Sequence, residues 1–96
     1  MIAALPQLLI LDVRTQSEVD ADGKIAGAEL HDYLHGDDMF QSLEKIDRER
    51  RCLIYCAIGG RAKLTAARMT TMGFTHLSLL KGGFNSWIAA GKPVQK

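Results

Sequence analysis

Apolar residues along the chain gather in short runs of strand length, separated by polar or amphipathic segments. The runs cover residues 8–13, 28–30, 52–56 and 76–80. The longer runs show little alternation of apolar and polar positions, which is typical of strands buried on both faces of a parallel sheet. The first run ends in the polar residues Asp12 and Arg14, on either side of Val13. These runs therefore predict buried strands whose carboxyl ends meet polar loops.

The segments between the runs carry helical signals. Asp37 or Asp38 can cap a helix in which Met39, Leu43 and Ile46 recur, with Phe40, at helical spacing. The arginines at positions 50 and 51 suit the carboxyl end of this helix, because the helix dipole favours positive charge there. Residues 62–72 are rich in good helix formers, and the glycine at position 73 favours termination. The predicted helices cover residues 16–21, 37–51, 62–72 and 84–90.

This alternation predicts an α/β fold. Strands that alternate with helices favour a small, mostly parallel sheet of four to five strands, flanked by helices on both faces. We interpret residues 1–96 as a single domain, since the sequence contains no linker, repeat or low-complexity tract. Ligands of such sheets bind at the carboxyl ends of the strands. Asp12, Arg14 and Cys56 are expected at such ends.

Composition narrows the range of partners and compartments. The 96 residues are 47 % hydrophobic, which predicts a packed core, and the formal net charge is +1. This balance favours neither nucleic acid nor a membrane surface as a partner. No apolar run is long enough to span a bilayer. Residues 1–7 contain no basic residue and no signal-peptide pattern, so we expect a cytoplasmic protein.

The two cysteines, Cys52 and Cys56, call for separate explanations. Both fall in one predicted strand, where four steps separate their Cα atoms by about 13 Å. A disulfide needs a separation of about 4.4–6.8 Å, so this pair cannot bridge within the strand. Cys52 is in the middle of an apolar run and has no loop or cation pattern of its own. We therefore expect Cys52 to be a small core residue.

Cys56 begins a segment whose features all stabilise a thiolate. It ends a predicted strand and is followed by Ala57, Ile58, Gly59, Gly60 and Arg61, after which a helix is predicted. The two glycines let backbone N–H groups turn inward around the sulfur, and the start of the helix adds partial positive charge. Arg61 adds a full positive charge. Because the thiolate is the reactive form of cysteine, Cys56 is the candidate nucleophile.

At this point the sequence resembles the rhodanese family. Four motifs occur in the family's order: Asp12-Val13-Arg14 with Glu18, residues 23–28, Cys56-x-x-Gly59-x-Arg61, and an ending that runs from residue 80 to 94 with Trp87. The resemblance covers roughly residues 5–95. It departs from the family pattern at Lys24, Ala26 and Ala62, and in the short segment before the first strand.

The resemblance implies a sulfurtransferase. A sulfane-sulfur donor such as thiosulfate would pass its outer sulfur to Cys56, and the resulting persulfide would pass it to cyanide or a thiol. Arg61 would help to bind the anionic donor. The backbone of Ala57, Ile58, Gly59, Gly60 and Arg61 would hold the transferred sulfur. We expect neither a cofactor nor a metal.

Two other functions compete with this hypothesis. One is a sulfur-relay or regulatory module that delivers the persulfide to one protein partner, in a domain that could be part of a longer protein. The other is phosphate hydrolysis, because a related phosphatase family has a similar loop with five residues between its cysteine and arginine. Here only four residues separate Cys56 from Arg61, which favours a cradle for one sulfur atom.

A group of potential metal ligands lies between residues 31 and 38. It contains His31, Asp32, His35, Asp37 and Asp38. Zinc sites use such ligands, but no spacing here fixes a geometry. We interpret these residues as a loop and a helix cap. Asp12 and Arg14 could contact the active-site loop or form a structural ion pair, and we assign neither as catalytic.

Overall fold

The computed structural model describes residues 8–95 and contains a four-stranded parallel sheet. The strands are β1 (Leu9–Asp12), β2 (Glu29–Leu30), β3 (Cys52–Tyr55) and β4 (Leu77–Leu79). Their order in the sheet is β2-β1-β3-β4, and all three pairings are parallel. Leu11 pairs with Ile54 in the register of β1 and β3. The predicted α/β class and strand number are therefore confirmed.

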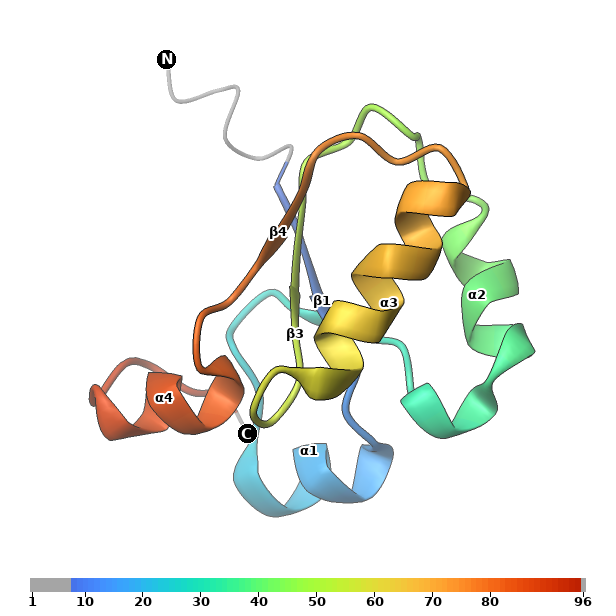
Figure 1. The fold of residues 1–96 in the computed structure, drawn as a ribbon. Coiled ribbons are helices and arrows are strands. Elements are labelled where there is room, and N and C mark those ends of the chain that lie inside the picture. Colours follow the sequence, from blue (N-terminus) through green and yellow to red (C-terminus); the bar gives the residue numbers. More distant parts are fainter. Residues whose placement is uncertain (1–7, 96) are drawn as a thin grey trace.

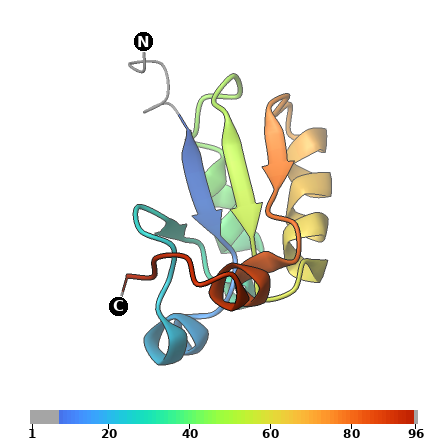
Figure 2. The ribbon, with the colours of Figure 1, turned by 90° about the vertical axis from the view of Figure 1, so that its left-hand side faces the viewer.

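Helices lie on both faces of this sheet. They are α1 (Gln16–Asp22), the short 3-10 helix η2 (Tyr33–His35), α2 (Asp37–Leu43), α3 (Gly60–Thr71) and α4 (Gly83–Ala89). Figure 1 shows α2 and α3 side by side on one face, and α1 and α4 near the carboxyl ends of the strands. In Figure 2 the red helix α4 crosses in front of these ends, while α2 and α3 lie behind the sheet. Within residues 8–95, no helix has the length and apolar character that crossing a membrane requires.

The two faces of the sheet have separate cores. The larger core fills the space between the sheet, α2 and α3. It contains Leu9, Leu11, Val13, Met39, Leu43, Cys52, Ile54, Cys56, Ala62, Met69 and Phe74. The smaller core lies on the α4 side and contains Ile25, Ala28, Tyr55 and Phe84. Period-two alternation along β3 explains the division, because Ile54 and Tyr55 point to opposite faces.

A buried polar network joins the carboxyl ends of the two central strands. Arg14 is 1 % exposed and binds Asp12 with Nη2 at 2.7 Å from Oδ2. The Tyr55 hydroxyl donates to the same oxygen at 2.7 Å and accepts from the Ile25 N–H at 3.1 Å. Burial raises the pKa of Tyr55 well above its ordinary value, so the hydroxyl keeps its proton. Of the two roles that the sequence leaves open for Asp12 and Arg14, this geometry shows the structural ion pair.

The helix predicted over residues 37–51 is shorter than expected. It ends at Leu43, with Glu44 as its C-cap. Arg48 explains the early end, because its Nη1 donates to the carbonyls of Glu44 and Ile46, each at 2.8 Å. The Glu44 carbonyl, at the C-cap, thereby gains a partner that the helix does not provide, and the Ile46 carbonyl is bound in the turn that follows. Ile46 still packs against the larger core, but from outside the helix.

The residues discounted as a metal site form a turn and a cap. The Asp32 carboxylate accepts from the Leu34 N–H at 2.8 Å and from the Gln16 N–H at 2.9 Å. His31 contacts Ser42 and Glu29. Sequence patterning missed η2, which Asp32 caps and Gly36 ends at φ 54°. Asp32 thereby ties η2 to the beginning of α1.

Candidate active site

Cys56 lies directly after β3, at the beginning of the short loop that connects β3 to α3. The helix begins at Gly60, two residues earlier than predicted, so Arg61 belongs to its first turn. Gly59 precedes the helix at φ 145°, a conformation that side-chain-bearing residues rarely adopt. The glycine therefore lets the chain turn sharply around the cysteine.

Two backbone N–H groups point at the sulfur. The N–H of Gly59 donates to Sγ at 3.1 Å, and that of Ala62 donates at 3.4 Å. Ala62 lies in the first turn of α3, where backbone N–H groups have no partner within the helix. Both contacts bring the partial positive charge of an N–H group next to the sulfur. We call this arrangement of residues 56–62 the cradle.

The cradle is braced from the side by α4. The N–H groups of Phe84 and Asn85 donate to the carbonyls of Cys56 at 2.8 Å and Ala57 at 3.0 Å. Gly83 makes this approach possible, since a Cβ there would lie 2.7 Å from the Cys56 carbonyl oxygen and 2.6 Å from that of Ala57. These carbonyls are therefore directed toward α4. Ile58, at the tip of the loop, is 73 % exposed.

Arg61 is held by a carboxylate from another helix. Its Nη1 lies 2.6 Å from Oε1 of Glu18 and its Nη2 lies 2.9 Å from Oε2, which is a bidentate pair. The hydrogen bond to Arg61 lowers the pKa of Glu18 to about 2. The same contact raises the pKa of Arg61, and Cys56 contributes to this in smaller measure. Both charges of the pair are therefore present at neutral pH.

Helix α1 is fixed at both ends, and this fixes Glu18. At the amino end, Glu18 and Thr15 form a capping box, and Asp32 accepts from the Gln16 N–H. Hydrogen bonding from Gln16 is the main cause that lowers the pKa of Asp32. At the carboxyl end, the buried Arg14 donates to the Gly23 carbonyl at 2.7 Å. Glu18 therefore faces Arg61 from a firmly placed element.

The role of Glu18 was missed by sequence reasoning. The sequence shows Glu18 only as part of a motif with Asp12-Val13-Arg14, whereas the structure places it next to the cradle. One local signal exists, because a threonine followed three residues later by glutamate predicts a capping box. That signal places Glu18 in the first turn of a helix, but it does not indicate its contact with Arg61.

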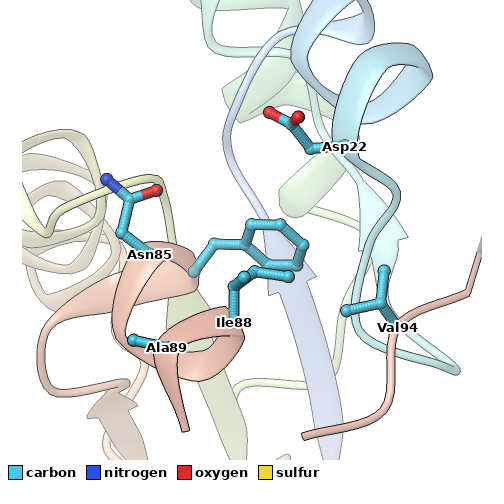
Figure 3. A pocket seen from close by; sticks show the side chains of 6 residues that line it. Asp22, Asn85, Ile88, Ala89 and Val94 are labelled. Carbon is cyan, nitrogen blue, oxygen red and sulfur yellow. The ribbon is translucent and has the colours of Figure 1, made fainter. Parts of the chain in front are cut away.

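A groove of about 480 Å³ lies near the cradle, between α4, the end of α1 and the C-terminal segment. Its lining residues are Asp22, Phe84, Asn85, Ile88, Ala89 and Val94. Figure 3 shows the side chains of Ile88 and Val94 facing this space, with Asp22 across from them. The groove shares Phe84 and Asn85 with the brace of the cradle, but Cys56 is not part of its lining. Among residues 8–95, no three His, Cys, Asp or Glu side chains are grouped to hold a metal ion.

Comparisons with known proteins show what this chain is similar to. The protein named thiosulfate sulfurtransferase GlpE from Coxiella burnetii is 34 % identical over 82 residues, covering 85 % of this chain and 73 % of its own. A protein from Arabidopsis thaliana named dual specificity phosphatase Cdc25 is 35 % identical over 101 residues, covering 93 % of this chain and 67 % of its own. The crystal structure of a rhodanese-like domain from Anabaena sp. superimposes with a TM-score of 0.78 at 30 % identity, covering 93 % of this chain and 99 % of its own.

The family match is the broadest of these findings. The family described as Rhodanese-like domain matches residues 1–90, which is nearly the whole chain. The resemblance that the four sequence motifs indicate is thereby confirmed. This chain belongs to the rhodanese-like domain family.

Proposed function

We propose that this domain is a sulfurtransferase in which Cys56 carries the sulfur. The observation that carries the proposal is the pair of N–H groups, from Gly59 and Ala62, that point at Sγ. Relatives named as sulfurtransferases support the general activity. The choice of donor and acceptor and the persulfide on Cys56 are part of what we propose.

The reaction has two displacement steps. The Cys56 thiolate attacks the outer sulfur of a donor such as thiosulfate, the donor's S–S bond breaks, and sulfite leaves with the bonding electrons. A thiolate or cyanide then attacks the outer sulfur of the persulfide, and the Cys56 thiolate is regenerated. Cys56 is 1 % exposed, but the added sulfur moves the reactive atom about 2 Å away from Sγ. An acceptor can thus react without contacting Sγ itself.

Other residues of the cradle hold the transferred sulfur and bind the sulfur donor. The backbone of Ala57, Ile58, Gly59 and Gly60 forms the wall that surrounds the transferred sulfur. Arg61 keeps N–H donors that Glu18 does not use, because a guanidinium has five of them. We assign these donors to the oxygens of the sulfur donor.

Phosphate hydrolysis is the second candidate, because one relative carries a phosphatase name. A phosphoryl group requires donors for three equatorial oxygens in its transition state. The passage from Cys56 through Arg61 contains six residues, and two N–H groups of the cradle reach the sulfur itself. We infer that this cradle accommodates one sulfur atom and excludes a phosphoryl group. Inserting one residue between Gly59 and Arg61 should lower sulfur transfer and open weak phosphatase activity.

Mass spectrometry of the intact chain tests the proposal directly. After treatment with thiosulfate, the parent should gain one sulfur, and cyanide should remove it with formation of thiocyanate. An aryl phosphate incubated in parallel should remain unhydrolysed. A persulfide that only one protein partner can discharge would favour the relay alternative. Robust phosphate hydrolysis without a persulfide on Cys56 would contradict the proposal.

A further inference from the structure

The positive charge of Arg61 is already balanced before any donor arrives. Both terminal nitrogens bind Glu18, at 2.6 Å and 2.9 Å. The carboxylate also accepts from the N–H and the hydroxyl of Thr15, at 3.0 Å and 3.1 Å. Because Glu18 remains ionised at neutral pH, the Glu18–Arg61 pair has no net charge.

Glu18 cannot easily move aside when a donor binds. It lies in the first turn of α1, and this helix is held by Asp32 at one end and by Arg14 at the other. The side chains of Arg61 and Glu18 are 29 % and 31 % exposed, so solvent only partly screens them. A donor that contacts Arg61 therefore also meets the Glu18 carboxylate nearby.

This arrangement affects donors according to their charge. Thiosulfate brings two negative charges to a pair that offers hydrogen bonds but no net attraction. An organic thiosulfonate or a hydrodisulfide brings one negative charge at most. The repulsion between like charges is stronger near a protein surface than in bulk water. The second charge of a dianion is thus a substantial penalty at this position.

We propose that Glu18 is a specificity-determining residue that selects singly charged sulfur donors over dianionic ones by neutralising Arg61. The inference rests on the proposed sulfurtransferase function. For a thiosulfonate, the Cys56 thiolate attacks the outer sulfur, the S–S bond breaks, and a sulfinate leaves with the bonding electrons. The persulfide on Cys56 and the charge balance are the same as with thiosulfate, where sulfite leaves. The two donors therefore differ in charge and in leaving group, but not in the product on the protein.

The test compares thiosulfate with benzenethiosulfonate in the parent, Glu18→Gln and Asp20→Asn. Glutamine can also complete a capping box, so Glu18→Gln removes the charge while keeping a partner for Thr15. Asp20→Asn is the matched control, because Asp20 lies on the same helix and its exposed contact is with Gln16. In Glu18→Gln, the ratio of kcat/KM for thiosulfate to that for benzenethiosulfonate should rise about tenfold. In Asp20→Asn it should stay within about twofold of the parent.

Ionic strength provides a second readout that a purely structural role of Glu18 would not change. With thiosulfate, kcat/KM of the parent should depend weakly on salt, whereas that of Glu18→Gln should fall as salt rises, because a free cation attracts the dianion. An unchanged donor ratio in Glu18→Gln, or an equal loss with both donors, would overturn the inference. A steep fall of kcat/KM for thiosulfate with rising salt in the parent would also overturn the inference, even if Glu18→Gln failed to fold. Failure of the proposed function looks different, since no donor would then place sulfur on Cys56 of the parent.

Discussion

Strand β3 carries a cysteine at its amino end and is followed directly by another at its carboxyl end, and both side chains are 1 % exposed. Cys52 packs in the larger core, and its Sγ donates to the carbonyl of Arg50 at 3.6 Å. Burial raises the pKa of the Cys52 thiol. Cys56 is buried to the same degree, but two N–H groups point at its sulfur and a cation lies nearby. Equal burial therefore goes with a carbonyl contact to the sulfur at one end and with two N–H contacts to the sulfur at the other.

The difference between the two ends follows from the parallel sheet. At the carboxyl end of β3 the chain enters α3, whose first turn supplies free N–H groups. At the amino end the chain arrives from a turn and presents carbonyl oxygens, as Arg50 does to Cys52. A carbonyl disfavours a thiolate, whereas an N–H group favours it. The direction of the strand, rather than its depth in the protein, decides which backbone groups face each sulfur.

The largest difference in sulfur loading should appear between two variants, in each of which serine replaces one of the two cysteines. Cys56→Ser should abolish sulfur loading completely, because the nucleophile is lost. Cys52→Ser should keep most of the activity and lose about 1–3 kcal/mol of unfolding free energy, because a hydroxyl replaces a core thiol. Intact mass after thiosulfate treatment and denaturant unfolding measure the two quantities. An equal loss of loading in both variants would remove the distinction between the two ends.

The next largest effect should come from removing Arg61, the cation near the carboxyl end of β3. Arg61→Ala removes the donors assigned to thiosulfate and leaves the Glu18 carboxylate uncompensated beside the cradle. We expect kcat/KM for thiosulfate to fall about 10- to 100-fold, since a hydrogen bond to a charged group contributes about 1.5–3 kcal/mol. Arg61→Lys should rescue only part of this loss, because a point charge does not reproduce the planar fork. Steady-state kinetics check both variants, and unchanged values in Arg61→Ala would exclude a role for this residue.

A smaller effect should follow from disturbing the brace between α4 and the cradle. Gly83 and Gly91 both have positive φ, at 66° and 71°, so alanine strains the backbone equally at either position. Only at Gly83 would the new Cβ meet backbone oxygens of Cys56 and Ala57. Gly91→Ala should therefore cost about 1–2 kcal/mol of stability with normal sulfur loading. Gly83→Ala should cost a further ~1–3 kcal/mol and slow the loading of Cys56.

Thermal unfolding and the rate of persulfide formation measure this pair of variants. Equal loading rates in Gly83→Ala and Gly91→Ala would show that the position of α4 does not matter to the cradle. A slower rate in Gly83→Ala alone would support the brace as a condition of reactivity at the carboxyl end of β3.

Features that are local in the sequence were predictable, and those that join distant segments were not. The cradle could be inferred because Cys56, Gly59 and Arg61 are neighbours whose geometry depends on one strand end and one helix start. The Glu18–Arg61 pair joins residues 43 positions apart, and no periodicity reports such a contact. The early end of α2 depends likewise on Arg48, which also reaches the carbonyl of Met72, 24 positions away. Propensity and spacing describe each segment, whereas these contacts arise only from packing.

The smallest predicted effect concerns stability in acid. The folded-state pKa of Glu18 is about 2, below its ordinary value of 4.5, so its ionised form stabilises the folded chain. This contribution is complete above about pH 5 and is lost as pH falls toward 2. Glu18→Gln lacks it, so its unfolding free energy should fall less than the parent's across this window, by on the order of 1 kcal/mol for a partly exposed pair. The carboxylate of Asp32, whose pKa is also lowered, contributes equally in both proteins and cancels in the difference.

Denaturant unfolding at a series of pH values measures the two curves, with Asp20→Asn as the control for charge removal from α1. Parallel curves for the parent and Glu18→Gln would mean that the Glu18–Arg61 contact does not persist in solution, and the carboxyl end of β3 would then offer an unneutralised arginine to any anion.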